Sequence, residues 1–144
     1  MATMVMKSAY VTITAVDISS AVTQVSIDYK AEIQDETAMG DATRRRLPGL
    51  KDWTANIDVN QDYATGVIDA TIFALLGTST FTLICKPDTA NGVSGSILSG
   101  SITNPLYTGV GVLESYMPLQ AQIGQLHKSR LVILAAGDLS RNVT

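Results

Sequence analysis

The chain has very little of the side-chain chemistry on which most enzymes depend, with one histidine and one cysteine in 144 residues. A single cysteine excludes a disulfide within the chain. Cys85 ends an apolar run over residues 81–85 and is expected to be a small buried side chain rather than a nucleophile. His127, beside Lys128 and Ser129, is expected at a solvent-facing rim rather than as a general base. We therefore predict a protein that is not an enzyme and that holds no cofactor or metal.

Charged residues are also scarce, at 16% of the chain, compared with about 25% in typical soluble domains. The net charge of −3 lacks the excess of Lys and Arg that a nucleic-acid-binding protein needs. No apolar run approaches the ~20 residues of a membrane span, and the first six residues lack the apolar core of a signal peptide. The composition predicts a protein of the cytosol, or of a particle assembled there. Contacts with other subunits would cover a surface so poor in charge, although a small, well-packed domain also tolerates it.

Hydrophobic alternation predicts one mainly β domain over residues 1–144, with short flexible termini. Strand-like segments occupy residues 10–17, 22–33, 52–61, 81–86, 107–116 and 126–135. Residues 95–103 are compatible with one more short strand. Gly109 and Gly111 interrupt a strand pattern, which predicts a bulge or a close approach of another group to the backbone. We expect an antiparallel β-sandwich or a strongly bent barrel.

One segment, residues 64–76, has a helical rather than an alternating period. Its apolar residues recur every three or four positions, which predicts one amphipathic α-helix packed on the flank of the sheet. Asp62 or Thr65 is suited to cap its first turn, and Gly77 suits the position just past its end.

The strongest candidate for a functional region is residues 34–52, a segment between two strands that contains Pro48 and Gly49. We predict a long hairpin loop here, whose first half is acidic and whose second half is basic. Because it has one acidic and one basic half, such a loop is suited to docking onto another copy of the same chain. The residues predicted to contact another copy are Asp35, Glu36, Asp41, Arg44, Arg45, Arg46, Leu47, Leu50 and Lys51.

Two other interpretations of this loop stay open. The run Arg44-Arg45-Arg46 is also a candidate contact to nucleic acid, although no aromatic residue stands beside it for stacking. The loop is alternatively a solvated segment without function. Trp53, the only tryptophan, follows at an inward strand position and is predicted to anchor the core. Its place near the base of the loop makes an interface role the alternative.

Several short motifs occur in a characteristic order along the chain. The longest is the run MGDATRRRLPGLKDW at residues 39–53, which is followed by Asn60-Gln61-Asp62 and by a helix-like segment that ends at Gly77. The motifs NPLYTG at residues 104–109 and GDLSR at residues 137–141 come later. In this order, from about residue 10 to residue 141, the chain resembles the tail tube proteins, or major tail proteins, of long-tailed bacteriophages.

The resemblance implies a β-sandwich with a flanking helix, and subunits that form rings of six. The rings, lined by a closed barrel of strands, would stack into a hollow tube through which DNA leaves the capsid. The implied partners are further copies of the chain, a tape measure protein and tail-end proteins, with DNA as a non-specific cargo and no membrane. The implied location is the virion tail, assembled in the cytoplasm of the bacterial host.

Two other functions stay open at this point. A phage head-decoration or head–tail connector protein would share the β-rich, weakly charged composition but would not need the loop at residues 34–52. A small ligand-binding β-sandwich would need a convergent polar pocket, for which the sequence offers neither a histidine cluster nor an aromatic platform.

Overall fold

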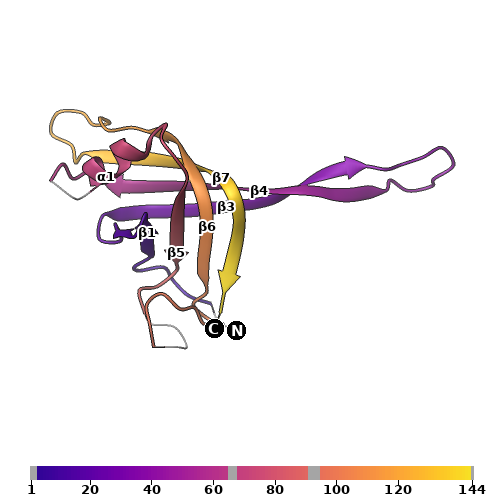
Figure 1. Cartoon of the computed structure of the whole chain (residues 1–144), viewed down its shortest axis with the longest axis horizontal. Helices are drawn as coiled ribbons and strands as arrows, with labels where there is room; N and C mark the ends of the chain where they lie inside the picture. Colours follow the sequence, from indigo (N-terminus) through magenta and orange to yellow (C-terminus); the bar gives the residue numbers. More distant parts are fainter. Residues whose placement is uncertain (1–2, 65–67, 91–94, 144) are drawn as a thin grey trace.

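A computed structural model describes residues 3–64, 68–90 and 95–143 of the chain. Its strands form one seven-stranded antiparallel sheet in the order β2-β1-β5-β6-β7-β4-β3 (Figure 1). The strands are β1 (Tyr10–Ile13), β2 (Val16–Asp17), β3 (Val22–Asp35), β4 (Arg46–Asn60), β5 (Phe81–Lys86), β6 (Leu106–Tyr116) and β7 (Lys128–Asn142). The prediction of a mainly antiparallel β fold with one helix is therefore confirmed.

The sheet bends along β6 and β7 (Figure 1). β7 pairs with β6 over most of its length but with β4 only at residues 128–134, and β6 pairs with β5 only at residues 107–111. Register shifts between Gly109 and Gly111, and between Leu113 and Ser115, bend β6 within this ladder. Within the described residues β2 and β3 remain the two edges, so the sheet is open rather than a closed barrel.

The core fills the inside of this bend. Residues 53–60 of β4 alternate between buried and half-buried positions, as the sequence predicts for a strand with one covered face. The helix α1 (Ile68–Leu75) adds Ile68 and Ile72 to the same core. The main fully buried side chains are Val11, Ile13, Trp53, Ala55, Ile57, Val59, Ile68, Leu131 and Ile133.

The helix is shorter than the predicted segment 64–76. It ends at Leu75, and Gly77 follows with a φ of +73°, the conformation expected of a glycine just past a helix end. Asp62 accepts a hydrogen bond from the backbone N–H of Ala64, whereas the alternative cap, Thr65, lies outside the described residues. No helix in the described part of the chain is both long and apolar enough to cross a bilayer.

Three strand predictions were wrong in their bounds. Residues 10–17 form a hairpin rather than one strand, because Thr14 and Ala15 both have positive φ and return the chain as β2. Residues 95–103 form turns and bends instead of a short strand. The last strand runs to Asn142 instead of ending at residue 135, because its second half pairs with β6.

Candidate functional site

The hairpin of β3 and β4 continues beyond the rest of the sheet as an arm, defined here as residues 28–52. Every residue of the arm is exposed, and Figure 1 shows it projecting far from the remainder of the molecule, which we call the body. β7 pairs with β4 only at residues 54–60, so the arm is a ribbon of two strands. A two-stranded hairpin is marginally stable in water by itself. The arm is therefore the part of the molecule that gains most from contact with another surface.

The turn at the end of the arm is shorter than the loop predicted at residues 34–52. Pairing continues from Tyr29 opposite Trp53 to Asp35 opposite Arg46, which leaves a loop of residues 36–45, called the tip here. The longer loop was predicted because Pro48 and Gly49 are typical loop residues.

Both residues lie instead within β4, where a register shift places one extra residue opposite β3. Proline is tolerated at this position because a strand edge with no further neighbour does not need its missing N–H.

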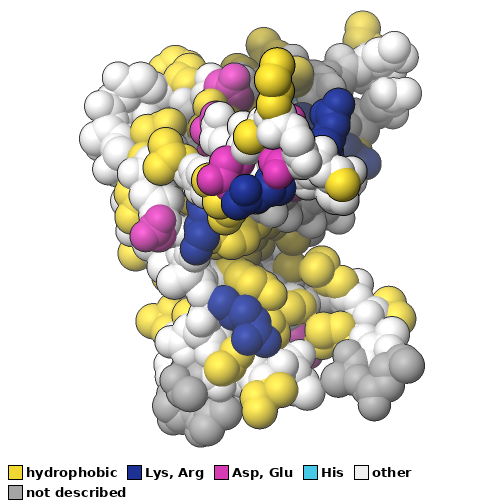
Figure 2. Space-filling view, turned by 90° about the vertical axis from the view of Figure 1, so that its right-hand side faces the viewer, with side chains coloured by type: hydrophobic (Ala, Val, Ile, Leu, Met, Phe, Trp, Pro, Cys, Tyr) yellow, Lys and Arg dark blue, Asp and Glu magenta, His cyan; other side chains and the backbone are white. Residues whose placement is uncertain are grey.

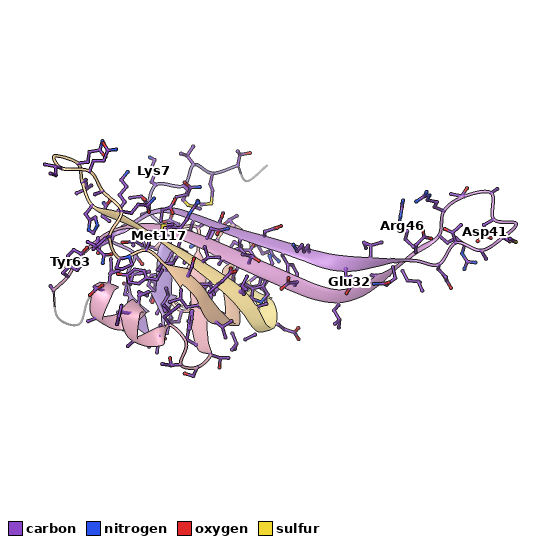
Figure 3. The ribbon with its side chains drawn as sticks, turned by 90° about the horizontal axis from the view of Figure 1, so that it is seen from above. Lys7, Glu32, Asp41, Arg46, Tyr63 and Met117 are labelled. Atoms are coloured by element: carbon purple, nitrogen blue, oxygen red, sulfur yellow. The ribbon has the colours of Figure 1, made fainter. Side chains whose placement is uncertain are left out.

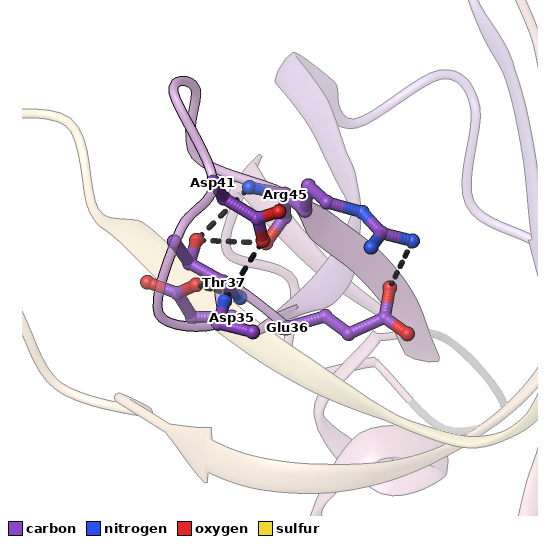
Figure 4. Close-up of polar contacts among 6 residues, drawn as sticks. Asp35, Glu36, Thr37, Asp41 and Arg45 are labelled. Atoms are coloured by element: carbon purple, nitrogen blue, oxygen red, sulfur yellow. Dashed lines mark hydrogen bonds and ion pairs between the residues drawn. The ribbon is translucent and has the colours of Figure 1, made fainter.

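The tip is held in shape by its own hydrogen bonds (Figure 4). Asp35 Oδ1 accepts the N–H of Thr37 at 2.9 Å, and Thr37 Oγ1 in turn accepts the N–H of Arg45 at 2.9 Å. Asp41 Oδ2 accepts the N–H of Ala38, also at 2.9 Å. Hydrogen bonds from Thr37 lower the pKa of the Asp35 carboxyl below its usual value. The tip is thus an ordered turn, and its own hydrogen bonds hold its shape without a partner.

The acidic and basic halves of the tip pair with each other within one copy. Arg45 lies 3.5 Å from Glu36, and Arg44 lies 3.9 Å from Asp35. Figure 2, which faces the arm, shows acidic and basic side chains next to one another. Exposed pairs of this kind contribute about 0–1 kcal/mol, so they exchange partners at little cost.

The other three charged residues predicted to contact another copy form no ion pair among the described residues: Asp41, Arg46 and Lys51.

Exposed apolar side chains follow both strands of the arm. Leu50 is 80% exposed, and Tyr29 is 48% exposed although it stands directly opposite the buried Trp53. Ile33, Met39 and Leu47 are exposed as well. Sequence reasoning found Leu47 and Leu50 but missed Tyr29 and Ile33, because both are in phase with the other apolar residues of the strand predicted at residues 22–33, a pattern typical of a covered face. Their exposure follows from the extension of the hairpin beyond Trp53, where no other strand covers it.

Trp53 lies at the root of the arm and belongs to the body. It is 1% exposed, and its Nε1–H donates to the carbonyl of Gly137 at 2.9 Å. A Cβ atom on Gly109 would lie 2.6 Å from Trp53 Cζ2, and one on Gly111 would lie 3.0 Å from Cη2. The close approach predicted for these two glycines of β6 is therefore confirmed: the indole ring is the nearest group at Gly109, whereas Ile133 Cγ2 at 2.7 Å and the Leu134 carbonyl oxygen at 2.9 Å are nearer at Gly111.

The residues considered for catalysis are engaged in packing. Burial raises the pKa of the Cys85 thiol to about 12, which keeps it protonated and unreactive at neutral pH. His127 stacks on Tyr63 with ring centroids 5.5 Å apart. Across the described residues, no group of three or more His, Cys, Asp and Glu side chains is placed to hold a metal ion.

Comparisons with known proteins find likeness in structure but not in sequence. No protein-family profile matches the chain, and no curated protein sequence matches it. A chain of the virion of a native gene transfer agent particle superposes with a TM-score of 0.69 at 17% identity, over 97% of this chain and 99% of that one. A chain from the tail of an empty gene transfer agent particle of C6 symmetry gives 0.60 at 17% identity, over 83% and 81%.

A third solved structure, the Dit protein of SPP1, gives a TM-score of 0.47 at 13% identity over 89% of this chain and 49% of that one. This likeness is too weak to support an argument. The two gene transfer agent chains show that the fold of this chain also occurs in subunits of virion and tail particles.

Proposed function

We propose that this protein is a structural subunit of a phage-like tail, and that its copies assemble into the hollow tail tube. The observation that carries this proposal is the arm, a ribbon in which all of residues 28–52 are exposed and which carries several large apolar side chains. A monomer gains nothing from such a ribbon, which is an aggregation hazard when uncovered. In an assembly the same ribbon is covered by neighbouring copies.

The open sheet supplies a second reason for assembly. Its edge strand β3 is 14 residues long and, among the described residues, pairs on one side only. A long unpaired edge is a ready template for another strand, and closure of several sheets into a ring removes it. The C6 symmetry of the tail particle that contains a similar fold makes a ring of six the first arrangement to test.

The charge of the chain agrees with a role as a conduit for DNA rather than as a protein that grips it. The net charge is −3, and two of the three arginines in the run at residues 44–46 already pair within the tip. A weakly negative wall repels phosphates weakly and lets a nucleic acid slide. DNA is then a non-specific cargo of the lumen, and the partners of the chain are its own copies and other tail proteins of the virion.

Negative-stain electron microscopy of the purified protein tests this function. We expect rings or hollow tubes whose length grows with protein concentration. Particles that remain monomeric at all concentrations and salt conditions, as analytical ultracentrifugation would also report, contradict the proposal. Discs or trimers that cap other particles without stacking would favour a head-decoration or connector protein instead.

A further inference from the structure

The end of the body opposite the arm tip carries an open groove with a volume of about 800 Å³. Its walls come from the start of β3, the end of β4, the start of β7 and the loop at residues 117–127, which joins β6 to β7. Figure 3 places Tyr63 and Met117, at this end of the molecule, far from Asp41 and Arg46 on the arm. Groove and tip therefore lie at the two ends of the long axis.

The groove has one uncompensated positive charge. Arg130 Nε lies 3.0 Å from Asp58 Oδ1, so these two charges pair with each other. Lys128, which lines the groove beside them, forms no ion pair among the described residues. Leu126 lines the groove as well and is exposed, as are Leu119 and Ile123 in the same loop. The groove thus offers one cation and an apolar rim.

The loop that forms one wall of the groove is fixed to the body through the only histidine. The backbone N–H of Gln120 donates to His127 Nε2 at 3.0 Å, so the ring proton is on Nδ1. Nδ1 then donates to the hydroxyl oxygen of Tyr63 at 2.7 Å, and that hydroxyl donates to the carbonyl of Pro118 at 2.6 Å. A wall held in this way is preformed, which lowers the ordering cost of binding.

We propose that this groove receives the arm tip of a second copy of the chain, an inference that rests on the proposed function. Met39, which is fully exposed on the tip, would contact the apolar rim at Leu126. Asp41, a charge of the tip that forms no ion pair among the described residues, would face Lys128. Donor and acceptor are different surfaces at opposite ends, so the contact is heterologous and can repeat from one copy to the next.

The chemistry of the groove favours this occupant over a nucleic acid. Nucleic acid carries a phosphate charge at every nucleotide, and a site for it needs several clustered cations. The groove has a single unpaired one, which matches the single unpaired carboxylate of the tip. Both surfaces are also held in shape by hydrogen bonds within one copy, so neither has to reorganise for docking.

Disulfide trapping in the assembled protein tests the contact. The double variant Met39→Cys with Gln125→Cys is assembled, oxidised and run on a non-reducing gel, while the buried native Cys85 stays unreactive. We expect a ladder of covalent multimers beyond the dimer, because each copy carries one donor and one acceptor. The matched control is Met39→Cys with Leu98→Cys, whose second site is exposed in the segment between β5 and β6. It should give no ladder.

A charge swap gives an independent readout that does not depend on cysteine geometry. Lys128→Glu should raise the protein concentration needed for assembly by about tenfold or more, because like charges then face each other. Adding Asp41→Lys in the same chain should restore assembly. Adding Asp138→Lys instead, an exposed site on β7, should not, although the net charge is the same.

The outcomes separate the contact from the function on which it rests. Tubes from the parent chain, with no ladder from the Gln125 pair and no rescue by Asp41→Lys, would overturn the docking site and leave the proposed function intact. A parent chain that never assembles would overturn the proposed function and the docking site together. A ladder from the Gln125 pair that is absent from the Leu98 pair would establish the groove as the acceptor.

Discussion

The two halves of β4 belong to one strand but have opposite environments. Residues 53–60 alternate between buried and half-buried positions, whereas residues 46–52 are exposed throughout. The difference comes from their neighbours: β7 and the core cover the first segment, and only β3 accompanies the second. Alternation therefore predicts the strand at residues 53–60, whereas residues 46–52, which contain Pro48 and Gly49, carry no such pattern and form a strand only because β3 pairs with them. In the body the covering surface belongs to the same chain, and for the arm we propose that other copies supply it.

The largest expected effect on stability is at the point where the arm meets the body. Trp53→Ala should lower the free energy of unfolding by about 3–5 kcal/mol, because it leaves a cavity under β6 and removes the hydrogen bond to Gly137. Urea denaturation of the variant measures this. If the variant unfolds like the parent and loses only assembly, then Trp53 serves the contact between copies and not the core.

Filling the space beside the indole should have the next largest effect. A methyl group on Gly109 would lie 2.6 Å from the Trp53 ring, so Gly109→Ala should cost about 1–3 kcal/mol through overpacking. Gly137→Ala is the matched control, since its Cβ would make an ordinary contact of 3.4 Å with Val110. Equal unfolding midpoints for the two variants would show that the ring is free to move away.

A pH titration of stability should show a smaller effect in the body. The pKa of Tyr116 is raised to about 12, mainly by burial and also by the hydrogen bond that its hydroxyl donates to Asp69. Because the phenol ionises at about pH 10 in the unfolded chain, its contribution is fully present below pH 10 and is lost as the pH rises toward 12.

Between pH 10 and 12 the free energy of unfolding of the parent should therefore fall more steeply than that of Tyr116→Phe. The difference between the two slopes should be below about 1.4 kcal/mol per pH unit. Thermal unfolding of both proteins between pH 9 and 12 measures the difference. Parallel curves would exclude the buried phenol as the titrating group.

The smallest effect on the fold is expected from the charges of the tip. Reversing Arg44, Arg45 and Arg46 to Glu should lower the free energy of unfolding by about 1 kcal/mol or less, because all three are exposed and the ion pairs of Arg44 and Arg45 are weak. The same triple variant should impair tube formation, because the new glutamates would repel Asp35 and Glu36 and so disturb the tip that docks onto the next copy.

Two controls sharpen this test. Changing the three arginines to glutamine removes the charge without adding repulsion and should impair assembly less. High salt should partly restore assembly of the glutamate variant, because the screening length falls to about 3 Å at 1 M. Full-length tubes from the glutamate variant at low salt would show that apolar or backbone contacts of the arm are sufficient.

Most of the body could be predicted from the sequence, because there the local pattern and the final packing agree. The alternation after Trp53, the helix and the glycines of β6 each correspond to a feature of the structure. The hairpin of β1 and β2 could not be predicted, because Thr14 and Ala15 carry no turn signal and adopt positive φ in spite of their side chains.

The candidate site was predictable only in part. The charged segment at residues 34–52 was found from its composition, but its length was overestimated because Pro48 and Gly49 lie in a bulge of β4. The cis pairing of Arg44 and Arg45 with the acidic residues of the tip depends on strand register. The groove at the other end of the molecule joins four segments distant in sequence, so no local pattern indicates it.

The claim that the arm serves assembly and not the fold is tested most directly by shortening it. Ala31 and Lys51 stand opposite each other, so residues 32–50 are replaceable by an Asn-Gly turn that closes the hairpin at its root. Sedimentation velocity of this variant and the parent, at a concentration at which the parent forms tubes, is the decisive measurement. We predict a folded protein that sediments as nothing larger than a single ring. Tubes like those of the parent would contradict the account.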